Sequence, residues 1–238
     1  MKQGIIIGAS SGIGWELAVQ LAAKGYQLGL MARRVDRLEQ LADGLSGEHF
    51  IQGTDLRDAE QAQQDLQDLI DRMGNVELIV VNSGVGIKER KLDWIGEKET
   101  IDVNVRGFAA MSVTAMNYFL ERGAGHLVGV SSVASHASGG LSLTYTASKA
   151  FVSNYLEGMR SRAQHSGLPI RVTTVEPGFV KTPMVDWNAF WMAPVDKAVA
   201  QMVKAISKQK NHVYITKRWR LVVWILELTP RWLMRKFG

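Results

Sequence analysis

Residues 4–14 read GIIIGASSGIG and join a continuously apolar run to a loop that contains three glycines. The run Ile5–Ile7 predicts a strand buried on both faces, and the apolar spacing from Ile13 onward predicts a helix. A glycine turn between such a strand and helix places free backbone N–H groups and the positive end of the helix dipole at one point. The stretch therefore predicts a strand–turn–helix unit that can bind a phosphate group.

The spacing G-x-x-x-G-x-G leaves two other interpretations of this turn. One is a glycine turn that binds no ligand. The other is a nucleophile elbow, because residues 8–12 also match G-x-S-x-G with Ser10 as the nucleophile. A nucleophile elbow lies in mid-sheet after several strands, whereas this turn follows the first predicted strand. We therefore favour a dinucleotide site over a serine hydrolase.

Short apolar segments alternate with helical patterns along the rest of the chain. Strands are predicted at residues 4–7, 27–32, 49–54, 78–82, 126–130, 171–175 and 213–215. Helices are predicted at residues 13–24, 35–45, 58–73, 98–121 and 146–165, where apolar side chains recur at three- and four-residue intervals. This alternation predicts an α/β fold in which a parallel sheet is covered by helices on both faces.

The composition excludes several classes of protein. A chain of 238 residues that is 46% apolar and 21% charged is typical of a globular protein, not of a collagen, a coiled coil or a disordered chain. Because it has no cysteine, disulfides, thiolate metal sites and cysteine nucleophiles are excluded. No metal site is predicted, since no ligand-like spacing links His49, His126, His136, His165 and His212.

The net charge of +5 is unevenly distributed. Residues 208–238 contain eight basic side chains and one acidic side chain, Glu227, so they carry +7 and the preceding residues carry −2. A near-neutral body argues against nucleic-acid binding. The sequence also predicts no signal peptide, and no stretch reaches the roughly 18 apolar residues of a membrane-spanning helix.

The end of the second predicted strand bears on the choice of dinucleotide. It reads Met31-Ala32-Arg33-Arg34, with no acidic residue before Asp36. An acidic side chain here would bind the adenosine ribose and repel a 2′-phosphate, whereas guanidinium groups attract one. We therefore predict a preference for NADP(H) over NAD(H); the alternative is that both arginines are solvated surface charges. Asp55, after the third predicted strand, lies where an adenine could be contacted.

Tyr145 and Lys149 are four residues apart, so on a helix they share one face. A phenol has an ordinary pKa of about 10 and exchanges protons poorly at neutral pH. A cation held beside it lowers that pKa and prepares the hydroxyl for general acid–base catalysis. The Y-x-x-x-K pattern is common by chance, so its weight depends on the residues that accompany it.

Two further polar residues are placed to join this pair. Ser132 closes the fifth predicted strand and precedes Tyr145 by 13 residues, which allows a loop to bring the two together. Its hydroxyl would hold a substrate carbonyl oxygen while Tyr145 protonates it. Asn104 lies among apolar helical neighbours and needs a buried partner. One interpretation is that Asn104 relays a proton or fixes Lys149 through water. The alternative is that it satisfies an irregularity in the helix.

Taken together, these residues resemble the short-chain dehydrogenase/reductase family over residues 4–205. The shared motifs, in family order, are Gly8-x-x-x-Gly12-x-Gly14, Asp55, Asn82-Ser83-Gly84, Asn104, Ser132, Tyr145-x-x-x-Lys149 and Pro177-Gly178-x-Val180-x-Thr182. The sequence departs from the family pattern at Ile7, Ser83 and Glu176, where a threonine, an alanine and a small or amide residue are usual.

The resemblance implies a single Rossmann-type, doubly wound domain with a seven-stranded parallel sheet, and hydride transfer between a nicotinamide and a carbonyl or alcohol. It implies that Tyr145 is the general acid/base, that Lys149 lowers its pKa and binds the nicotinamide ribose, that Ser132 orients the substrate and that Asn104 maintains a proton relay. Ser10 with Arg33 would hold the 2′-phosphate. The implied cofactor-binding residues are Gly8, Ser10, Ser11, Gly12, Ile13, Gly14, Arg33, Arg34, Asp55, Leu56, Asn82, Ser83, Gly84, Tyr145, Lys149, Pro177, Gly178, Val180 and Thr182.

The family's substrate lid corresponds to residues 183–195, within a domain predicted to span residues 1–215. Met184, Trp187, Phe190 and Trp191 predict an apolar pocket for a hydrophobic carbonyl compound. The same side chains would equally well pack the lid on the body or join subunits.

Residues 216–238 form a basic, amphipathic C-terminal extension rich in tryptophan. Such a segment either lies in a membrane interface or packs on protein, and we favour protein contact. The family implies a homodimer or homotetramer, which this extension could modify. We expect a cytoplasmic location, with peripheral contact at the inner face of a membrane if the extension binds lipid.

The function predicted from the sequence is an NADP(H)-dependent oxidoreductase that interconverts a hydrophobic carbonyl compound and its alcohol. The alternative is a dinucleotide-binding regulator or scaffold with vestigial reductase activity. The intact set Asn104, Ser132, Tyr145 and Lys149 argues against the alternative, because a regulator does not need a lysine-activated phenol.

Overall fold

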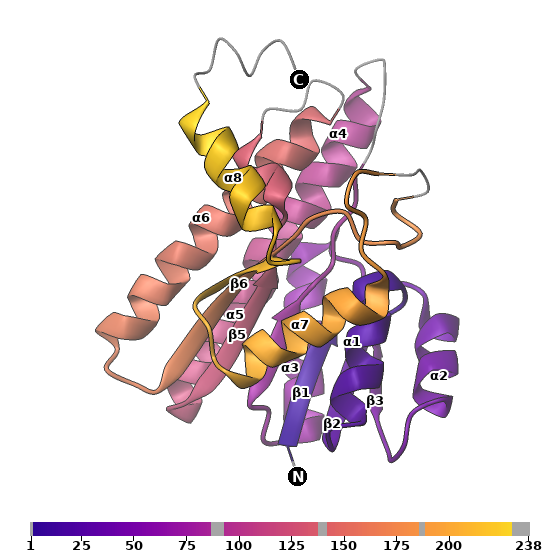
Figure 1. Ribbon diagram of the computed structural model, residues 1–238. Helices are drawn as coiled ribbons and strands as arrows, with labels where there is room; N and C mark the ends of the chain where they lie inside the picture. Colours follow the sequence, from indigo (N-terminus) through magenta and orange to yellow (C-terminus); the bar gives the residue numbers. More distant parts are fainter. Residues whose placement is uncertain (1, 87–92, 138–141, 186–188, 230–238) are drawn as a thin grey trace.

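The computed structural model describes residues 2–86, 93–137, 142–185 and 189–229 (Figure 1). Seven parallel strands form one sheet in the order β3-β2-β1-β4-β5-β6-β7. The strands are β1 (Lys2–Ile7), β2 (Tyr26–Ala32), β3 (Phe50–Gly53), β4 (Leu78–Val81), β5 (Gly125–Val130), β6 (Ile170–Pro177) and β7 (His212–Ile215). The predicted Rossmann-type parallel sheet is therefore confirmed.

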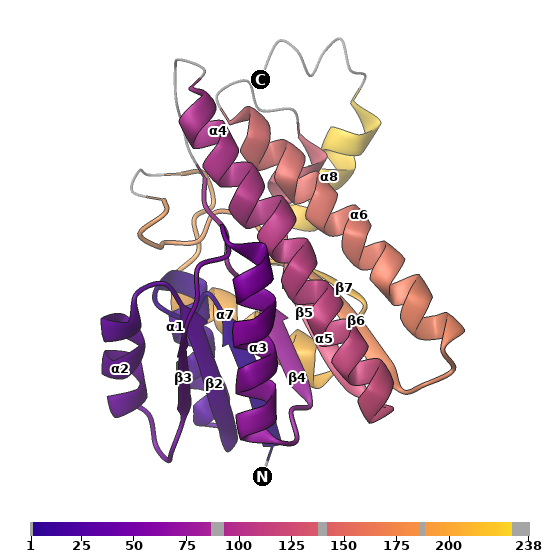
Figure 2. The same ribbon diagram turned by 180° about the vertical axis from the view of Figure 1, so that it is seen from behind.

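Helices cover both faces of this sheet (Figures 1 and 2). One face carries α1 (Gly12–Ala22), α2 (Val35–Asp43) and α7 (Val195–Ser207). The other carries α3 (Ala59–Met73), α5 (Phe108–Arg122) and α6 (Leu143–His165). The helix α4 (Trp94–Ile101) leads into α5, and α8 (Trp219–Leu228) follows β7. In the described ranges no helix is both long enough and apolar enough to span a bilayer.

The core divides into two apolar clusters, one on each face, because side chains alternate along every strand. In β1, Ile5 and Ile7 join the cluster under α3 and α5, whereas Ile6 joins the cluster under α1 and α7. All three side chains are fully buried. Burial on both faces explains why these strands are continuously apolar in the sequence.

The helical pattern predicted at residues 98–121 is longer and less regular in the structure. It begins at Trp94, and residues Asp102–Gly107 between α4 and α5 form a π-helical turn, η1. The helix α7 lies outside the predicted helical segments, although its buried residues Ala198, Met202, Val203 and Ile206 have helical spacing. A short 3-10 turn, η2 (Val133–His136), follows β5.

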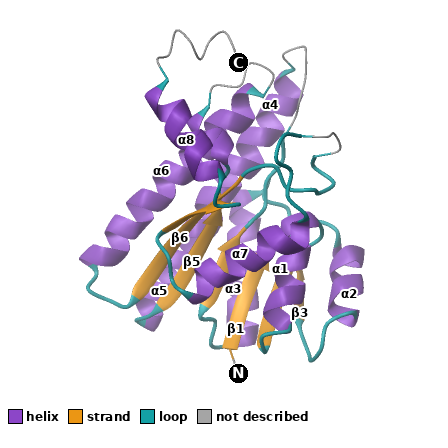
Figure 3. Ribbon diagram, viewed as in Figure 1, coloured by secondary structure: helices purple, strands orange, loops and turns teal. Residues whose placement is uncertain are grey.

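The carboxyl ends of β1, β4, β5 and β6 meet at one edge of the sheet (Figure 3). The glycine loop follows β1, residues 82–86 follow β4, Ser131 and Ser132 follow β5, and Pro177 ends β6. Parallel strands bring these segments together, and this edge holds the site described next.

Candidate functional site

A cleft of about 290 Å³ opens at this edge. Apart from Gly14 and Asn104, every predicted catalytic and cofactor-binding residue lines it. Gly14 lies directly behind the cleft, and Asn104 lies beneath it. The lining also includes Ala32, Thr54, Val85, Val103, Val130, Ser131, Pro183 and Val185, which no sequence motif singled out.

Backbone contacts shape the glycine loop. Gly8 has a φ of +91°, a conformation that favours glycine, and its carbonyl oxygen accepts a hydrogen bond from Asn82 Nδ2 at 3.0 Å. Gly14 sits so close that a Cβ there would overlap the Gly8 carbonyl oxygen and lie 2.7 Å from Asn82 Nδ2. Ser11, the N-cap residue of α1, makes no side-chain capping hydrogen bond, and the amino terminus of a helix offers free N–H groups to an anion.

The two consecutive arginines differ in their contacts. Arg34 Nη2 donates to Ser10 Oγ and to Ser11 Oγ, each at 3.0 Å. Arg33 instead lies 3.5 Å from Glu99 Oε1 across the cleft edge, with both side chains well exposed. The resemblance pairs Ser10 with Arg33, whereas the structure places Arg34 against Ser10. A guanidinium and two hydroxyls at a helix amino terminus form an anion site.

The adenosine end of the cleft has one anchored acid and one hydroxyl without a partner. Asp55 accepts a forked contact from Arg57 and this hydrogen bonding lowers the pKa of the carboxyl. The adjacent Thr54 Oγ1 is buried without a hydrogen-bond partner among the described residues. An unpaired hydroxyl, an anion site and a glycine cradle without room for a Cβ fit a bound dinucleotide.

Tyr145, Ser132 and Lys149 converge at the other end of the same cleft. The Lys149 Nζ is 5.8 Å from the centre of the Tyr145 ring and donates to the Val130 carbonyl oxygen at 3.0 Å. Ser132 Oγ accepts the N–H of Ala134 at 3.1 Å and donates to the Pro177 carbonyl oxygen at 3.4 Å. A hydrogen bond links Ser132 with Tyr145.

The pKa of Tyr145 shifts in the direction opposite to the one expected from its neighbour. Burial raises the pKa of the Tyr145 phenol, and the hydrogen bond with Ser132 opposes this only in part. Burial also lowers the pKa of Lys149 to about 8. Within this structure the influence that opposes burial comes from Ser132, so the lowering of the phenol pKa by Lys149 stays a prediction.

Asn104 lies in the π-helical turn and is fully buried. Its Oδ1 accepts the Val85 N–H at 2.9 Å, and its Nδ2 donates to the Val85 carbonyl at 2.8 Å and to Ser148 Oγ at 3.0 Å. The helix is irregular here, as one alternative anticipated, but the side chain holds the loop after β4 and not the helix itself. Sequence reasoning missed Val85 because a backbone partner leaves no residue-type signal.

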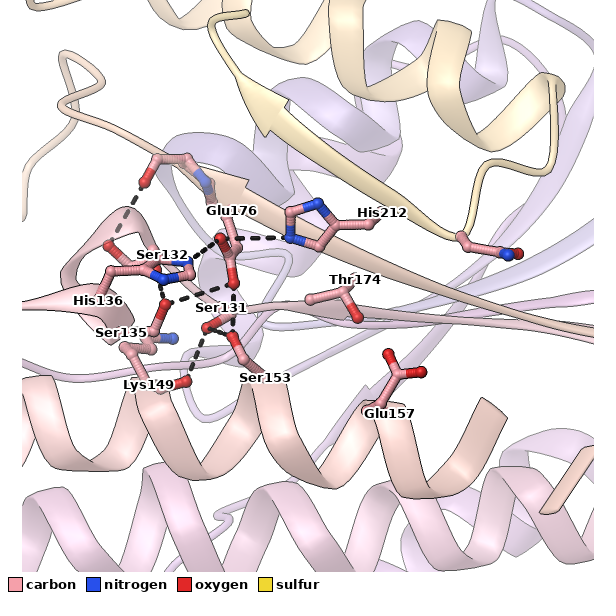
Figure 4. A network of polar contacts seen from close by, with 12 residues as sticks. Ser131, Ser132, Ser135, His136, Lys149, Ser153, Glu157, Thr174, Glu176 and His212 are labelled. Atoms are coloured by element: carbon pink, nitrogen blue, oxygen red, sulfur yellow. Dashed lines mark hydrogen bonds and ion pairs between the residues drawn. The ribbon is translucent and has the colours of Figure 1, made fainter. Parts of the chain in front are cut away.

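A buried carboxylate lies directly behind Ser132 (Figure 4). Glu176 is 1% exposed, and it accepts hydrogen bonds from Ser153 at 2.7 Å, Ser135 at 3.3 Å and His136 at 2.8 Å. His212 lies 3.3 Å from the same carboxylate. Burial opposes ionisation, but these donors together hold the pKa of Glu176 at about 2. The acid is therefore a charged anchor for the turn η2 that begins after Ser132.

The predicted substrate residues separate into different places. Met184 lines the cleft, whereas Phe190 and Trp191 stack on each other with ring centres 4.6 Å apart and are not among its lining residues. Trp187 lies outside the described residues. Trp191 also meets Trp219 of α8 edge to face, with the ring centres 6.2 Å apart.

The helix α8 packs on its own subunit. Trp219 is 5% exposed, and a Cβ at Gly178 would overlap its indole ring. Farther along α8, Glu227 Oε1 lies 3.0 Å from His136 Nδ1, whose other ring nitrogen binds Glu176. Gly178 directly follows β6, and His136 lies in η2. Both contacts therefore attach α8 beside the edge of the sheet that holds the cleft.

Comparison with known proteins gives a family and several relatives. The sequence profile described as short chain dehydrogenase matches residues 2–191. An uncharacterized oxidoreductase of Mycobacterium tuberculosis is 35% identical over 98% of this chain and 96% of its own length. An uncharacterized oxidoreductase of Myxococcus xanthus is 33% identical over 93% of this chain and 89% of its own length.

Two solved structures have a similar fold. One is an alcohol dehydrogenase from the archaeon Thermococcus sibiricus complexed with 5-hydroxy-NADP, with a TM-score of 0.80 and 26% identity over 90% of this chain and 95% of that chain. The other is a short chain dehydrogenase/reductase from Burkholderia phymatum in complex with NAD, with a TM-score of 0.84. The second is 21% identical over 93% of this chain and 91% of that chain, which bears on the fold alone.

Proposed function

Since the chain belongs to the short chain dehydrogenase family of oxidoreductases, we propose that it interconverts a hydrophobic carbonyl compound and its alcohol with NADP(H). One observation carries this proposal. Tyr145, Ser132 and Lys149 line the same cleft as the glycine loop at the tip of α1. A group able to exchange a proton and a cradle for a dinucleotide therefore share one space.

The roles of the residues follow from their contacts. A bound nicotinamide dinucleotide supplies the hydride. Ser132, held in place by the Ala134 N–H, turns its hydroxyl from the Pro177 carbonyl to the substrate oxygen. Tyr145 gives its Oη proton to that oxygen during reduction and takes it back during oxidation. Lys149, fixed by Val130, holds the nicotinamide ribose, and its charge favours the phenolate when that site is filled.

The preference for NADP(H) is supported by Arg34. Its guanidinium and the hydroxyls of Ser10 and Ser11 form a cluster of donors at the amino terminus of α1. Such a cluster suits a 2′-phosphate. Of the two solved relatives described above, one holds an NADP derivative and the other NAD, so the preference of this chain rests on its own residues.

The finer predictions from the sequence stand as part of the proposal. Met184 at the cleft, on a lid of residues 183–195, favours an apolar substrate. We propose that residues 1–215 form the catalytic domain and that the enzyme is cytoplasmic and assembles as a homodimer or homotetramer, as the family resemblance implies.

A panel of hydrophobic ketones and aldehydes tests the proposed function. The purified chain is mixed with each compound and NADPH or NADH, and oxidation of the nucleotide is followed by absorbance. We expect turnover of at least one class of compound, faster with NADPH. If no compound of the panel causes oxidation of the nucleotide although NADPH binds tightly, the result would instead support a dinucleotide-binding regulator. Ester cleavage without nucleotide, lost on Ser10→Ala, would support a serine hydrolase.

A further inference from the structure

Large apolar side chains are exposed mainly at one end of the molecule. Eleven of the fourteen exposed large hydrophobic side chains in the described ranges lie in the first turns of α4 and α6, in residues 179–191 or on α8. In Figures 1 and 2, α4, the start of α6 and α8 lie at one end of the molecule, beyond the carboxyl ends of the strands. Met184, which lines the cleft, is itself 47% exposed. An apolar end of this kind marks an interaction surface.

The helix α8 is part of this surface, and it is apolar on two sides. Trp219 and Val223 face the subunit and are buried. Leu221, Trp224, Ile225 and Leu228 recur at three- and four-residue spacing and are 49% to 84% exposed. Because Trp219 and the Glu227–His136 contact attach α8 to the body, this outer stripe is held in place.

Basic side chains lie beside the stripe. In the described part of this segment, residues 208–229, five basic side chains stand against Glu227, a net charge of +4. The Arg220 guanidinium lies 4.8 Å from the centre of the Trp224 ring. A hollow of about 490 Å³ beside β7 is lined by Lys210, Lys217 and Arg220 together with Trp224. Cations and an indole ring at one surface are the groups that meet anionic lipid headgroups.

The same charge argues against a second copy of the chain on this face. A symmetric dimer would place two such segments, each carrying +4 over residues 208–229, against each other, and like charges repel. An anionic bilayer instead attracts the cations and accepts the apolar stripe. We propose that α8 and the rim of the cleft dock on an anionic lipid bilayer, which places the opening of the catalytic cleft at the membrane surface.

Vesicle flotation of the full-length chain tests this proposal. Vesicles of phosphatidylglycerol mixed with phosphatidylcholine are compared with phosphatidylcholine alone, at low and high salt. We expect binding to the anionic vesicles that weakens as salt rises. Ile225→Gln should lower the partition coefficient about tenfold, and Arg220→Gln about fivefold, because each removes a contact with the lipid.

Matched controls come from the opposite end of the sheet. Leu168, 36% exposed just before β6, is changed to glutamine, and the exposed Lys24, just before β2, is changed likewise. Both variants should bind vesicles as the unmodified chain does. Three results would each overturn the proposal: equal binding to both kinds of vesicle, equal binding by Ile225→Gln and Leu168→Gln, or a vesicle-free dimer that Ile225→Gln dissolves.

Vesicle binding is read without any substrate or nucleotide. A chain that binds vesicles but turns over no carbonyl compound would contradict the proposed function and leave the docking surface intact. A chain that reduces ketones but does not bind vesicles would contradict the docking surface and leave the proposed function intact.

Discussion

The nucleotide end and the substrate end of the cleft are built in different ways. At the nucleotide end, backbone and small residues meet so closely that Gly14 has no room for a Cβ beside the Gly8 carbonyl. Around the substrate end, large side chains outside the lining are exposed, Phe190 by 66% and Trp224 by 49%, and the buried Trp219 holds α8 in place. Close backbone contact fixes the shape of the first end, whereas side-chain choice sets the properties of the second.

This difference predicts how each end responds to substitution. A change at the nucleotide end should affect the dinucleotide and the fold together, because the same contacts serve both. A change at the substrate end should alter stability or partners while leaving the nucleotide affinity intact. The four predictions below test that division, from the largest expected effect to the smallest.

Gly14→Ala should have the largest combined effect on nucleotide affinity and stability. The added Cβ would overlap the Gly8 carbonyl, so the loop must shift. We expect NADPH affinity to fall by at least about 100-fold and the free energy of unfolding to fall by about 3 kcal/mol. Isothermal titration and chemical denaturation measure the two effects.

Gly158→Ala is the matched control, because Gly158 is also helical but a Cβ there meets nothing within 4 Å. It should leave NADPH affinity unchanged and stabilise the protein by up to about 1 kcal/mol. Similar results for the two variants would remove the claim that close contact shapes the loop.

Trp219→Ala tests the packing of α8 near the substrate end. Loss of this buried ring should lower the free energy of unfolding by about 4 kcal/mol, while the NADPH dissociation constant changes by less than about twofold. Trp224→Ala, on the same helix but 49% exposed, should cost less than about 0.5 kcal/mol. A large loss of NADPH affinity in Trp219→Ala would mean that the two ends are coupled.

Glu176→Gln addresses the buried carboxylate behind Ser132. Because the folded protein holds the pKa of Glu176 at about 2, below the ordinary carboxyl value, its charge stabilises the fold at neutral pH. That contribution, about 3 kcal/mol, should be lost as pH falls toward about 2. Denaturation as a function of pH should therefore show the gap between the unmodified chain and Glu176→Gln narrowing in acid.

The exposed Glu39 of α2 provides the control for this measurement. Because its side chain is exposed, Glu39→Gln should change the free energy of unfolding at neutral pH by less than about 0.5 kcal/mol. His136, whose pKa the neighbouring Glu176 raises, stabilises the fold while it is protonated, so its contribution should be lost as pH rises through that raised pKa. A gap between Glu176→Gln and the unmodified chain that stays constant across the acid range would contradict the assignment.

Arg34→Ala should have the smallest effect. Removing the guanidinium beside Ser10 and Ser11 should weaken NADPH by about tenfold more than NADH, since only NADPH carries the 2′-phosphate. Arg33→Ala breaks an exposed contact with Glu99, so the losses of NADPH and NADH affinity should differ less in this variant than in Arg34→Ala. Equal losses of NADPH and NADH in Arg34→Ala would refute the cofactor preference.

Features that depend on local residue types were predictable from the sequence. The strands were readable because burial on both faces makes them continuously apolar, and the glycine loop because few residues other than glycine fit its contacts. Tyr145, Ser132 and Lys149 were found by their positions in the sequence, and all three line one cleft in the structure. These features depend on local residue types, which a sequence displays directly.

The parts that escaped prediction depend on distant partners. Nothing in the sequence pairs Asn104 with the backbone of Val85, or selects Arg34 over Arg33 for Ser10. The raised pKa of Tyr145 arises from burial, which spacing does not reveal. Glu176 stood out only as an unusual residue before Pro177, and its link through His136 to Glu227 appears only when the chain is folded.

The central claim is that Tyr145 exchanges the proton that accompanies hydride transfer in this cleft. NADPH deuterated at the transferable position, a ketone reduced by the unmodified chain and mass spectrometry of the alcohol test it most directly. We predict deuterium on the carbinol carbon, and in Tyr145→Phe a rate lower by about 1000-fold with NADPH affinity changed by less than about twofold. Undiminished turnover by Tyr145→Phe, or an alcohol without deuterium, would contradict the claim.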